Sequence, residues 1–146
     1  MNEGAATATG LEQLQALMQS GKMPGIGRTV GFDLVEVAPG RVVFEGCPGV
    51  EVYNPIGTVH GGYAATLLDS ACGCAVHSQL SAAQTYSTLE LKIAYHRALT
   101  ADTGIVRATG SVVSMGRRAA FAEARLTDAA GKLYATATST LIVMER

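Results

Sequence analysis

HGGYAATLLDSA, residues 60–71, places one aspartate in an otherwise apolar run that begins with a histidine and two glycines. Around it, residues 60–79 carry alanine, leucine, cysteine and valine on nearly every face, so we expect a long helix that is buried all round. An ionised carboxylate is rarely buried without a partner. We therefore expect Asp69 either to have a structural partner or to take part in a reaction.

The distance from Asp69 to the start of this helix limits what the carboxylate can reach. If the helix begins at His60–Gly61, its first amides have no intrahelical acceptor and suit an anion or a developing oxyanion. Asp69 lies about 12 Å further along the axis, at roughly 1.5 Å per residue. The two groups can therefore share a reacting carbon only if a twofold axis lays a second helix antiparallel to the first. The spacing predicts an obligate dimer if they work together.

A purely structural role is the alternative for Asp69, as a cap or an ion-pair partner within its own chain. Candidate partners for that role are Ser70, Thr66 and Arg97. His60 alone is likewise more often a turn residue than a catalytic one. The combination of Asn54, His60 and Gly61–Gly62 with Asp69 nevertheless favours a functional site.

The rest of the chain predicts strands, preceded by one short helix. Residues 11–20 have the apolar spacing of an amphipathic helix, ended by Gly21 and Pro24. The later segments are two strands in residues 28–49 that form a hairpin at Pro39–Gly40, a loop at 51–62, and four runs at 85–99, 103–116, 117–131 and 132–146. The last three runs should pair antiparallel. The order predicts an α+β fold, with an antiparallel sheet of about six strands wrapped around one long central helix.

Composition limits the class of protein. The chain has 146 residues, 48% of them hydrophobic, which is enough for one domain with a substantial core. Its net charge is −1, with 11 basic and 12 acidic residues, so we expect no nucleic-acid partner. No run approaches the roughly 20 apolar residues that span a bilayer, so we expect no membrane partner.

The cysteines and the first residues suggest a cytoplasmic protein without a metal site. MNEGAATATG, residues 1–10, lacks the basic and apolar stretches of a secretory signal. The three cysteines are an odd number, which favours free thiols in a reducing compartment. Cys72 and Cys74 lie about 200° apart around a helix, so they cannot hold one metal ion together.

Two motifs resemble a known family. NPIGTVHGG, residues 54–62, followed by LLDSA, residues 67–71, resembles the hotdog-fold acyl-CoA thioesterases, especially the PaaI-type group named for phenylacetate degradation. The resemblance covers about residues 25–145. It implies a hotdog domain at 25–146, preceded by an N-terminal extension at 1–24 whose helix either caps the substrate pocket or packs outside it.

The resemblance implies a role for each residue of the motifs. The Gly61 N–H polarises the thioester carbonyl, and His60 and Asn54 lie beside the thioester. Asp69 of the partner subunit acts as general base on water or as direct nucleophile, two routes that sequence leaves open. Ser87, or failing that Thr88, helps hold the water.

The resemblance also implies how the substrate is bound and how the chains assemble. The implied residues for substrate and coenzyme A are Gly62, Thr88, Gly116, Arg117 and Arg118, with the arginines suited to phosphates. Coenzyme A enters as part of the substrate, so no separate cofactor is implied. Two subunits join edge to edge with adjacent helices, and such dimers commonly pair into tetramers.

We therefore expect an enzyme that hydrolyses an aryl- or fatty-acyl-CoA to the free acid and coenzyme A. Two alternatives remain at this level. One is a hotdog hydratase or dehydratase acting on 3-hydroxyacyl chains, for which no matching pair of a histidine and an acidic residue is visible. The other is a non-catalytic acyl-CoA binding or sensing module, which would not need the carboxylate of Asp69.

Overall fold

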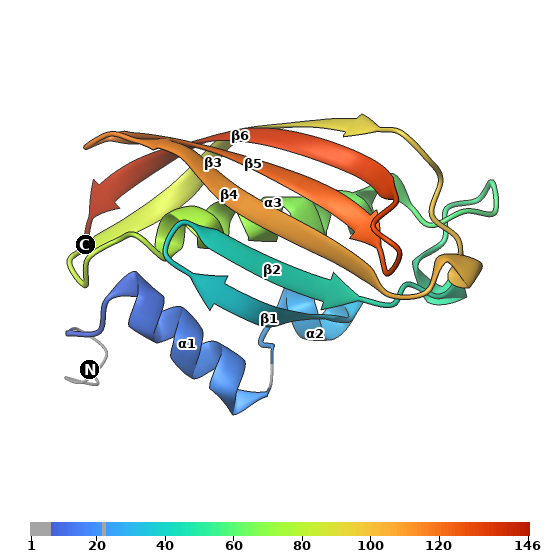
Figure 1. The fold of residues 1–146 in the computed structure, drawn as a ribbon, viewed down its shortest axis with the longest axis horizontal. Helices are drawn as coiled ribbons and strands as arrows, with labels where there is room; N and C mark the ends of the chain where they lie inside the picture. The colour runs from blue at the N-terminus through green and yellow to red at the C-terminus, as the bar shows by residue number, and fades with distance from the viewer. Residues whose placement is uncertain (1–6, 22) are drawn as a thin grey trace.

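The computed structural model describes residues 7–21 and 23–146 (Figure 1). Its helices are α1 (Gly10–Ser20), α2 (Ile26–Val30) and α3 (Gly61–His77), with short 3₁₀ turns at Val50–Val52 and Ala101–Thr103. Its strands are β1 (Phe32–Ala38), β2 (Arg41–Gly46), β3 (Gln84–Tyr95), β4 (Val106–Met115), β5 (Ala119–Asp128) and β6 (Leu133–Glu145).

The strands form one antiparallel sheet in the order β1-β2-β4-β5-β6-β3. Figure 1 shows this sheet curved around α3. The predicted α+β fold is thus confirmed, including the hairpin of β1 with β2 and the meander from β4 to β6. The order leaves β1 and β3 as the two edge strands of the sheet.

Small side chains on the inner face of the sheet allow α3 to lie close to it. The buried small residues of this face are Ala108, Gly110, Ala120, Ala122, Ala124, Ala135 and Ala137. At Gly110 an added Cβ would collide with the backbone carbonyl of Ala71 in α3. The larger members of the core, such as Phe44 and Leu67, fill the space on either side of this contact.

Strand β3 runs alongside α3 in the opposite direction. Each end of the strand and its centre contact a different turn of the helix. The contacting pairs are Tyr95 with Gly61, Thr88 with Asp69, and Tyr86 with His77. The edge strand therefore contacts α3 near its start, its middle and its end.

One stripe of α3 is less buried than we expected. The prediction of a helix buried all round is wrong for the single chain, because nothing among the described residues fully covers this stripe. The half-buried residues of the stripe are Ala65, Thr66, Asp69, Ser70, Cys74 and His77. Asp69 therefore lies on the one face of α3 that is open to a further contact.

The first predicted strand begins later than the sequence suggested. Residues 26–30 form α2, which ends at Gly31 with a positive φ of 88°. That left-handed conformation is available to glycine and does not continue a strand. β1 therefore starts at Phe32, where the apolar alternation becomes regular.

Helix α1 docks at the far end of α3 from Gly61. A capping box between Thr9 and Glu12 starts α1 and a left-handed Gly21 ends it, close to the predicted bounds of 11–20. The Gly10 N–H donates to the Leu80 carbonyl at 3.0 Å, and Gln13 Oε1 lies 3.0 Å from Nε2 of His77. α1 thus packs on β1 and on the last turn of α3, away from the start of that helix.

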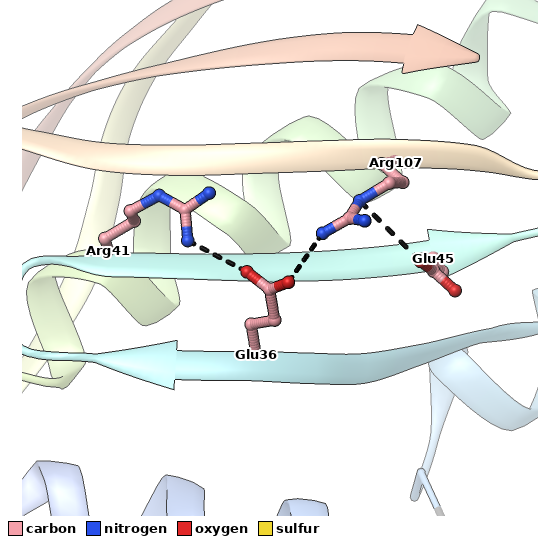
Figure 2. A network of polar contacts seen from close by, with 4 residues as sticks. All are labelled: Glu36, Arg41, Glu45 and Arg107. Carbon is pink, nitrogen blue, oxygen red and sulfur yellow. Dashed lines mark hydrogen bonds and ion pairs between the residues drawn. The ribbon is translucent and has the colours of Figure 1, made fainter. Parts of the chain in front are cut away.

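A charged network crosses the outer face of β1, β2 and β4 (Figure 2). Glu36 on β1 accepts hydrogen bonds from Arg41 at 2.9 Å and from Arg107 at 2.8 Å, and Arg107 also lies 3.6 Å from Glu45. The two guanidinium groups hold the pKa of the Glu36 carboxyl below its usual value. Because these side chains are well exposed, water screens the pairs and they add little stability.

Two further findings concern the hydrophobicity of the helices and the state of the cysteines. Within residues 7–21 and 23–146, no helix is both long and apolar enough to cross a membrane. The cysteines Cys47, Cys72 and Cys74 are all free thiols.

Candidate active site

Asn54 organises the loop that leads into α3. Its Oδ1 accepts hydrogen bonds from the amides of Ile56 and Thr58, both at 3.1 Å. Its Nδ2 donates to Oγ1 of Thr58 at 2.9 Å. The side-chain oxygen is therefore used twice within the loop, and one N–H of the side-chain amide has no acceptor among the residues that the structure describes.

His60 caps the start of α3 with its ring. Nδ1 accepts the N–H of Gly62 at 2.7 Å, and the His60 carbonyl accepts the N–H of Tyr63 at 2.9 Å. Because Nδ1 is an acceptor here, the neutral ring carries its proton on Nε2. His60 thus presents an N–H donor on the side away from the helix.

The amide of Gly61 is left without an acceptor. Among the described residues no carbonyl or side chain accepts its N–H, whereas the amides of His60, Gly62 and Tyr63 are all bonded. This N–H lies at the positive end of α3. The predicted oxyanion donor is therefore an unpaired amide in the position that the sequence suggested.

A cleft of about 380 Å³ opens beside this amide. His60, Gly61 and Tyr95 lie along it together with apolar side chains such as Leu99 and Leu126. Arg97, which the sequence offered as an internal partner for Asp69, lines the cleft instead. The cleft combines an apolar wall with hydrogen-bond donors at one end, as expected of a small-molecule site.

Tyr95 is a site residue that the sequence analysis missed. Its hydroxyl donates to the carbonyl of Gly61 at 2.7 Å, and its ring lies against the Cα of that glycine. An aromatic residue at the end of a strand is too common to signal such a contact. Only the pairing of β3 with β6 and the packing of α3 bring the two residues together.

Asp69 has its partner within its own chain, and that partner is Thr88. Oγ1 of Thr88 donates to Oδ1 of Asp69 at 3.0 Å. Thr88 pairs with the buried Leu141 and faces α3, whereas Ser87 is exposed and faces the opposite side of the sheet. Of the two hydroxyls that the sequence offered, the structure brings the second one to the carboxylate.

The thiols near Asp69 are not nucleophiles at neutral pH. Burial raises the pKa of Cys72 and of Cys74 to about 12, and the charge of Asp69 adds to the rise in both. A thiol reacts as its thiolate, which is scarce several units below the pKa. The carboxylate of Asp69 remains the candidate base or nucleophile on this part of α3.

The three residues Gly116, Arg117 and Arg118, predicted to bind coenzyme A, lie together at the turn before β5. The Gly116 N–H donates to the Ala119 carbonyl at 2.8 Å, which closes the turn. Arg117 and Arg118 are exposed and line a concavity beside the end of β6, with a volume of about 830 Å³. No carboxylate in the described part of the chain forms an ion pair with either one, so both remain available to an anion.

Comparison with known proteins matches most of the chain. The family described as the thioesterase superfamily matches residues 56–135, from the loop before α3 into β6. Human acyl-coenzyme A thioesterase 13 is 37% identical over 103 residues, which is 70% of this chain and 72% of that protein.

Solved structures extend the match to the fold. A variant of the phenylacetic acid degradation protein PaaI from Thermus thermophilus is 29% identical with a TM-score of 0.72, covering 80% of this chain and 96% of that one. A Streptococcus mutans protein bound to acetyl CoA is 26% identical with a TM-score of 0.72, covering 80% of this chain and 90% of that one. The predicted likeness to PaaI-type thioesterases is confirmed. The chain belongs to the thioesterase superfamily of hotdog-fold enzymes.

Proposed function

We propose that this protein hydrolyses the thioester of an aryl- or fatty-acyl-CoA to the free acid and coenzyme A. The observation that carries the proposal is the unpaired N–H of Gly61 at the positive end of α3, beside a cleft and on the same helix as Asp69. A thioester is an activated acyl group. A carboxylate and a fixed oxyanion donor are therefore sufficient chemistry for its hydrolysis.

In the proposed reaction the Gly61 N–H donates to the thioester oxygen and holds the negative charge that develops there. As general base, Asp69 takes a proton from the attacking water, the C–S bond breaks, and the departing coenzyme A thiolate recovers that proton. As nucleophile, Asp69 attacks the carbonyl carbon and expels the thiolate, and water then hydrolyses the resulting acyl-aspartyl anhydride to the free acid. The Nε2–H of His60 and the free N–H of Asn54 assist in placing the carbonyl or the water. Thr88 orients the carboxylate of Asp69 through their hydrogen bond.

The proposed site is shared between two subunits. Asp69 lies about 12 Å along the helix from Gly61, a gap that one carboxylate cannot span. The stripe of α3 that carries Asp69 is only half buried, and β3 is an edge strand with no neighbour beyond it among the described residues. Both features support a twofold dimer in which each site takes Gly61 from one chain and Asp69 from its partner, with a pairing of two dimers as the further step.

Coenzyme A would be held by its phosphates at the turn before β5. Arg117 and Arg118 are exposed there without an ion-pair partner in the described part of the chain, and arginine suits phosphate groups. Gly116 gives the turn its shape, while Gly62 lies at the start of α3 beside the proposed thioester position.

The test follows thiol release from a panel of aryl- and fatty-acyl-CoA esters. Asp69→Asn and Asp69→Ala should lower kcat at least about a hundredfold, since a general base or nucleophile is lost. Full activity in both variants would remove Asp69 from the reaction. A wild-type chain that binds acyl-CoA without releasing thiol would instead be a binding module, and one that hydrates an enoyl-CoA would be a hydratase.

The role of the Gly61 N–H can be tested independently of Asp69. Proline at the first helical position keeps a helix but has no N–H, and the extended His60 before it accepts a following proline. Gly61→Pro should lower kcat by about 10²–10³, whereas Gly61→Ala keeps the N–H and serves as the control for contact with Tyr95. An equal loss of kcat in the two variants would mean that the added side chain crowds Tyr95, and that the missing N–H is not the cause.

Mixing inactive variants tests the shared site. In a random mixture of Asp69→Asn and Gly61→Pro chains, half the dimers are mixed, and each mixed dimer has one intact site. Activity should therefore recover to about one quarter of the wild-type value. A mixture as inactive as its components would show that both groups act from one chain.

A further inference from the structure

The peptide group between Gly61 and Gly62 is held at both ends. Its carbonyl oxygen accepts the hydroxyl of Tyr95 at 2.7 Å. Its N–H donates to Nδ1 of His60, also at 2.7 Å. The peptide plane at the start of α3 is therefore fixed by one side chain from the far end of β3 and one from the loop before the helix.

Tyr95 is placed to act on the reaction without touching the reacting atoms. It is the last residue of β3, and its side chain lines the same cleft as His60 and Gly61. Its hydroxyl and Cζ lie 3.2 and 3.3 Å from where a Cβ on Gly61 would be. Although Tyr95 is 54% exposed, its partial burial raises its pKa, so the phenol remains a donor at neutral pH.

The hydrogen bonds around this peptide form a relay in which each group donates to the next, from Tyr95 through the peptide to His60. The Tyr95 O–H polarises the amide, and the amide N–H donates to Nδ1 of His60. The Nε2–H at the far side of the imidazole has no acceptor in the described part of the protein. Each bond in such a relay strengthens the next one. Fixing the same peptide plane also limits the rotation of the adjacent Gly61 N–H, the proposed oxyanion donor.

We propose that Tyr95 is a positioning residue for the reaction: through the Gly61–Gly62 peptide it aims the Gly61 N–H and sets the tautomer and donor strength of His60. This inference rests on the proposed thioester hydrolysis. The helix does not depend on the phenol, because the Gly61 carbonyl can also accept the amide four residues ahead within α3. Loss of the hydroxyl should therefore change the reaction more than the fold.

The matched pair of variants is Tyr95→Phe and Tyr134→Phe. Tyr134 lines the same cleft, but its hydroxyl bonds Oδ2 of Asp128 at 3.3 Å, away from the start of α3. Tyr95→Phe should lower kcat about fivefold with KM changed less than twofold, because a bond that aims the oxyanion donors is lost. Because Tyr134 lines the cleft but does not contact the Gly61–Gly62 peptide, Tyr134→Phe is the control for the melting temperature and for the amide resonance described below. Both variants should melt within about 3 °C of the wild type.

A second readout does not depend on activity. The amide proton of Gly62 should resonate far downfield in the NMR spectrum because of its short bond to His60 Nδ1. In Tyr95→Phe this resonance should move upfield, since the carbonyl of the same peptide is no longer polarised. In Tyr134→Phe it should stay in place.

Several results would overturn the inference. An active wild type with an equally active Tyr95→Phe variant would overturn it alone, as would an unmoved Gly62 resonance. A parallel loss of kcat and melting temperature in both tyrosine variants would mean that the hydroxyl is only structural. A wild-type chain that releases no thiol from any ester would overturn the proposed function first, and this inference with it.

Discussion

The hydroxyl of Thr88 donates to Oδ1 of Asp69 at 3.0 Å and so joins the edge strand β3 to the middle of α3. No other donor in the described part of the chain bonds the carboxylate. Oδ2 therefore remains available to a water molecule or a substrate atom. One oxygen of Asp69 accepts the threonine hydroxyl, and the other accepts no donor within residues 7–21 and 23–146.

Replacing Thr88 should weaken the reaction, and replacing Ser87 should not. Thr88→Val keeps the shape of the side chain but removes a hydrogen bond to a charged group, worth about 1.5–3 kcal/mol. If that bond orients Asp69 in the transition state, kcat should fall at least about tenfold in the thiol-release assay. Thr88→Ser should recover most of the activity. A loss on Ser87→Ala with none on Thr88→Val would assign the role to Ser87 instead.

Removing the hydroxyl of Tyr63 should stabilise the protein. This hydroxyl is buried beside Gly46 without a hydrogen-bond partner in the described structure, and burial raises the pKa of Tyr63 to about 12. Tyr63→Phe should therefore raise the free energy of unfolding by about 1 kcal/mol, measured by urea denaturation. Tyr53→Phe is the opposite case, because that hydroxyl accepts the Ala101 amide at 2.8 Å. The Tyr53 variant should lose stability, and a loss of similar size in both would contradict the argument.

Stability should fall as the pH drops through the range in which histidine titrates. Burial, and then the charge of Arg146, lower the pKa of His77, whose Nδ1 is buried without a partner in the described structure. The unfolded chain takes up a proton at about pH 6.5 while the folded chain still resists it. The free energy of unfolding should thus be lower at pH 5.5 than at pH 7.5.

The control for this pH effect is His77→Gln, which cannot titrate but can still bond Gln13. Its free energy of unfolding should vary less between the two pH values than that of the wild type. Both values lie above the range in which Glu36 and Asp128 titrate, because hydrogen bonds lower the pKa of each. Equal pH dependence in the two proteins would rule out His77 as the source.

Enlarging Gly110 should displace α3. An added methyl group would meet the carbonyl of Ala71, so the helix or β4 has to move. We expect Gly110→Ala to cost about 1–3 kcal/mol of unfolding free energy, together with a loss of kcat. Thr109→Ala, at the adjacent position on the opposite face of β4, should change neither by much. A Gly110→Ala protein with full stability would show that α3 has room to spare.

The parts of the fold that could be predicted are those that depend on the pattern of neighbouring residues in the sequence. The apolar run with its glycine start fixes α3, and the strands from β4 to β6 follow alternating patterns with clear turns. α2 was missed because its five residues have the composition of a strand, and only the positive φ of Gly31 separates it from β1.

The contacts around the site depended on packing instead. The register of β3 against β6 shifts between Thr88 and Glu90, so alternation along the strand does not tell which hydroxyl faces Asp69. The bond from Tyr95 to Gly61 joins residues 34 apart in sequence, and no local pattern encodes it. The sequence thus offered Asp69, Gly61 and Thr88 as candidates, but the choice of Thr88 over Ser87 and the contact of Tyr95 with Gly61 came only from the packing.

The small residues on the inner face of the sheet have a consequence for engineering this protein. They determine how far α3 stands from the sheet, and α3 carries Gly61 and Asp69 while β3 carries their partners Tyr95 and Thr88. Filling the core with larger side chains, a common route to heat resistance, would lift the helix and separate both pairs at once. Heat-resistant variants of this chain are better sought on the outer face of the sheet, where side chains can change without moving the helix.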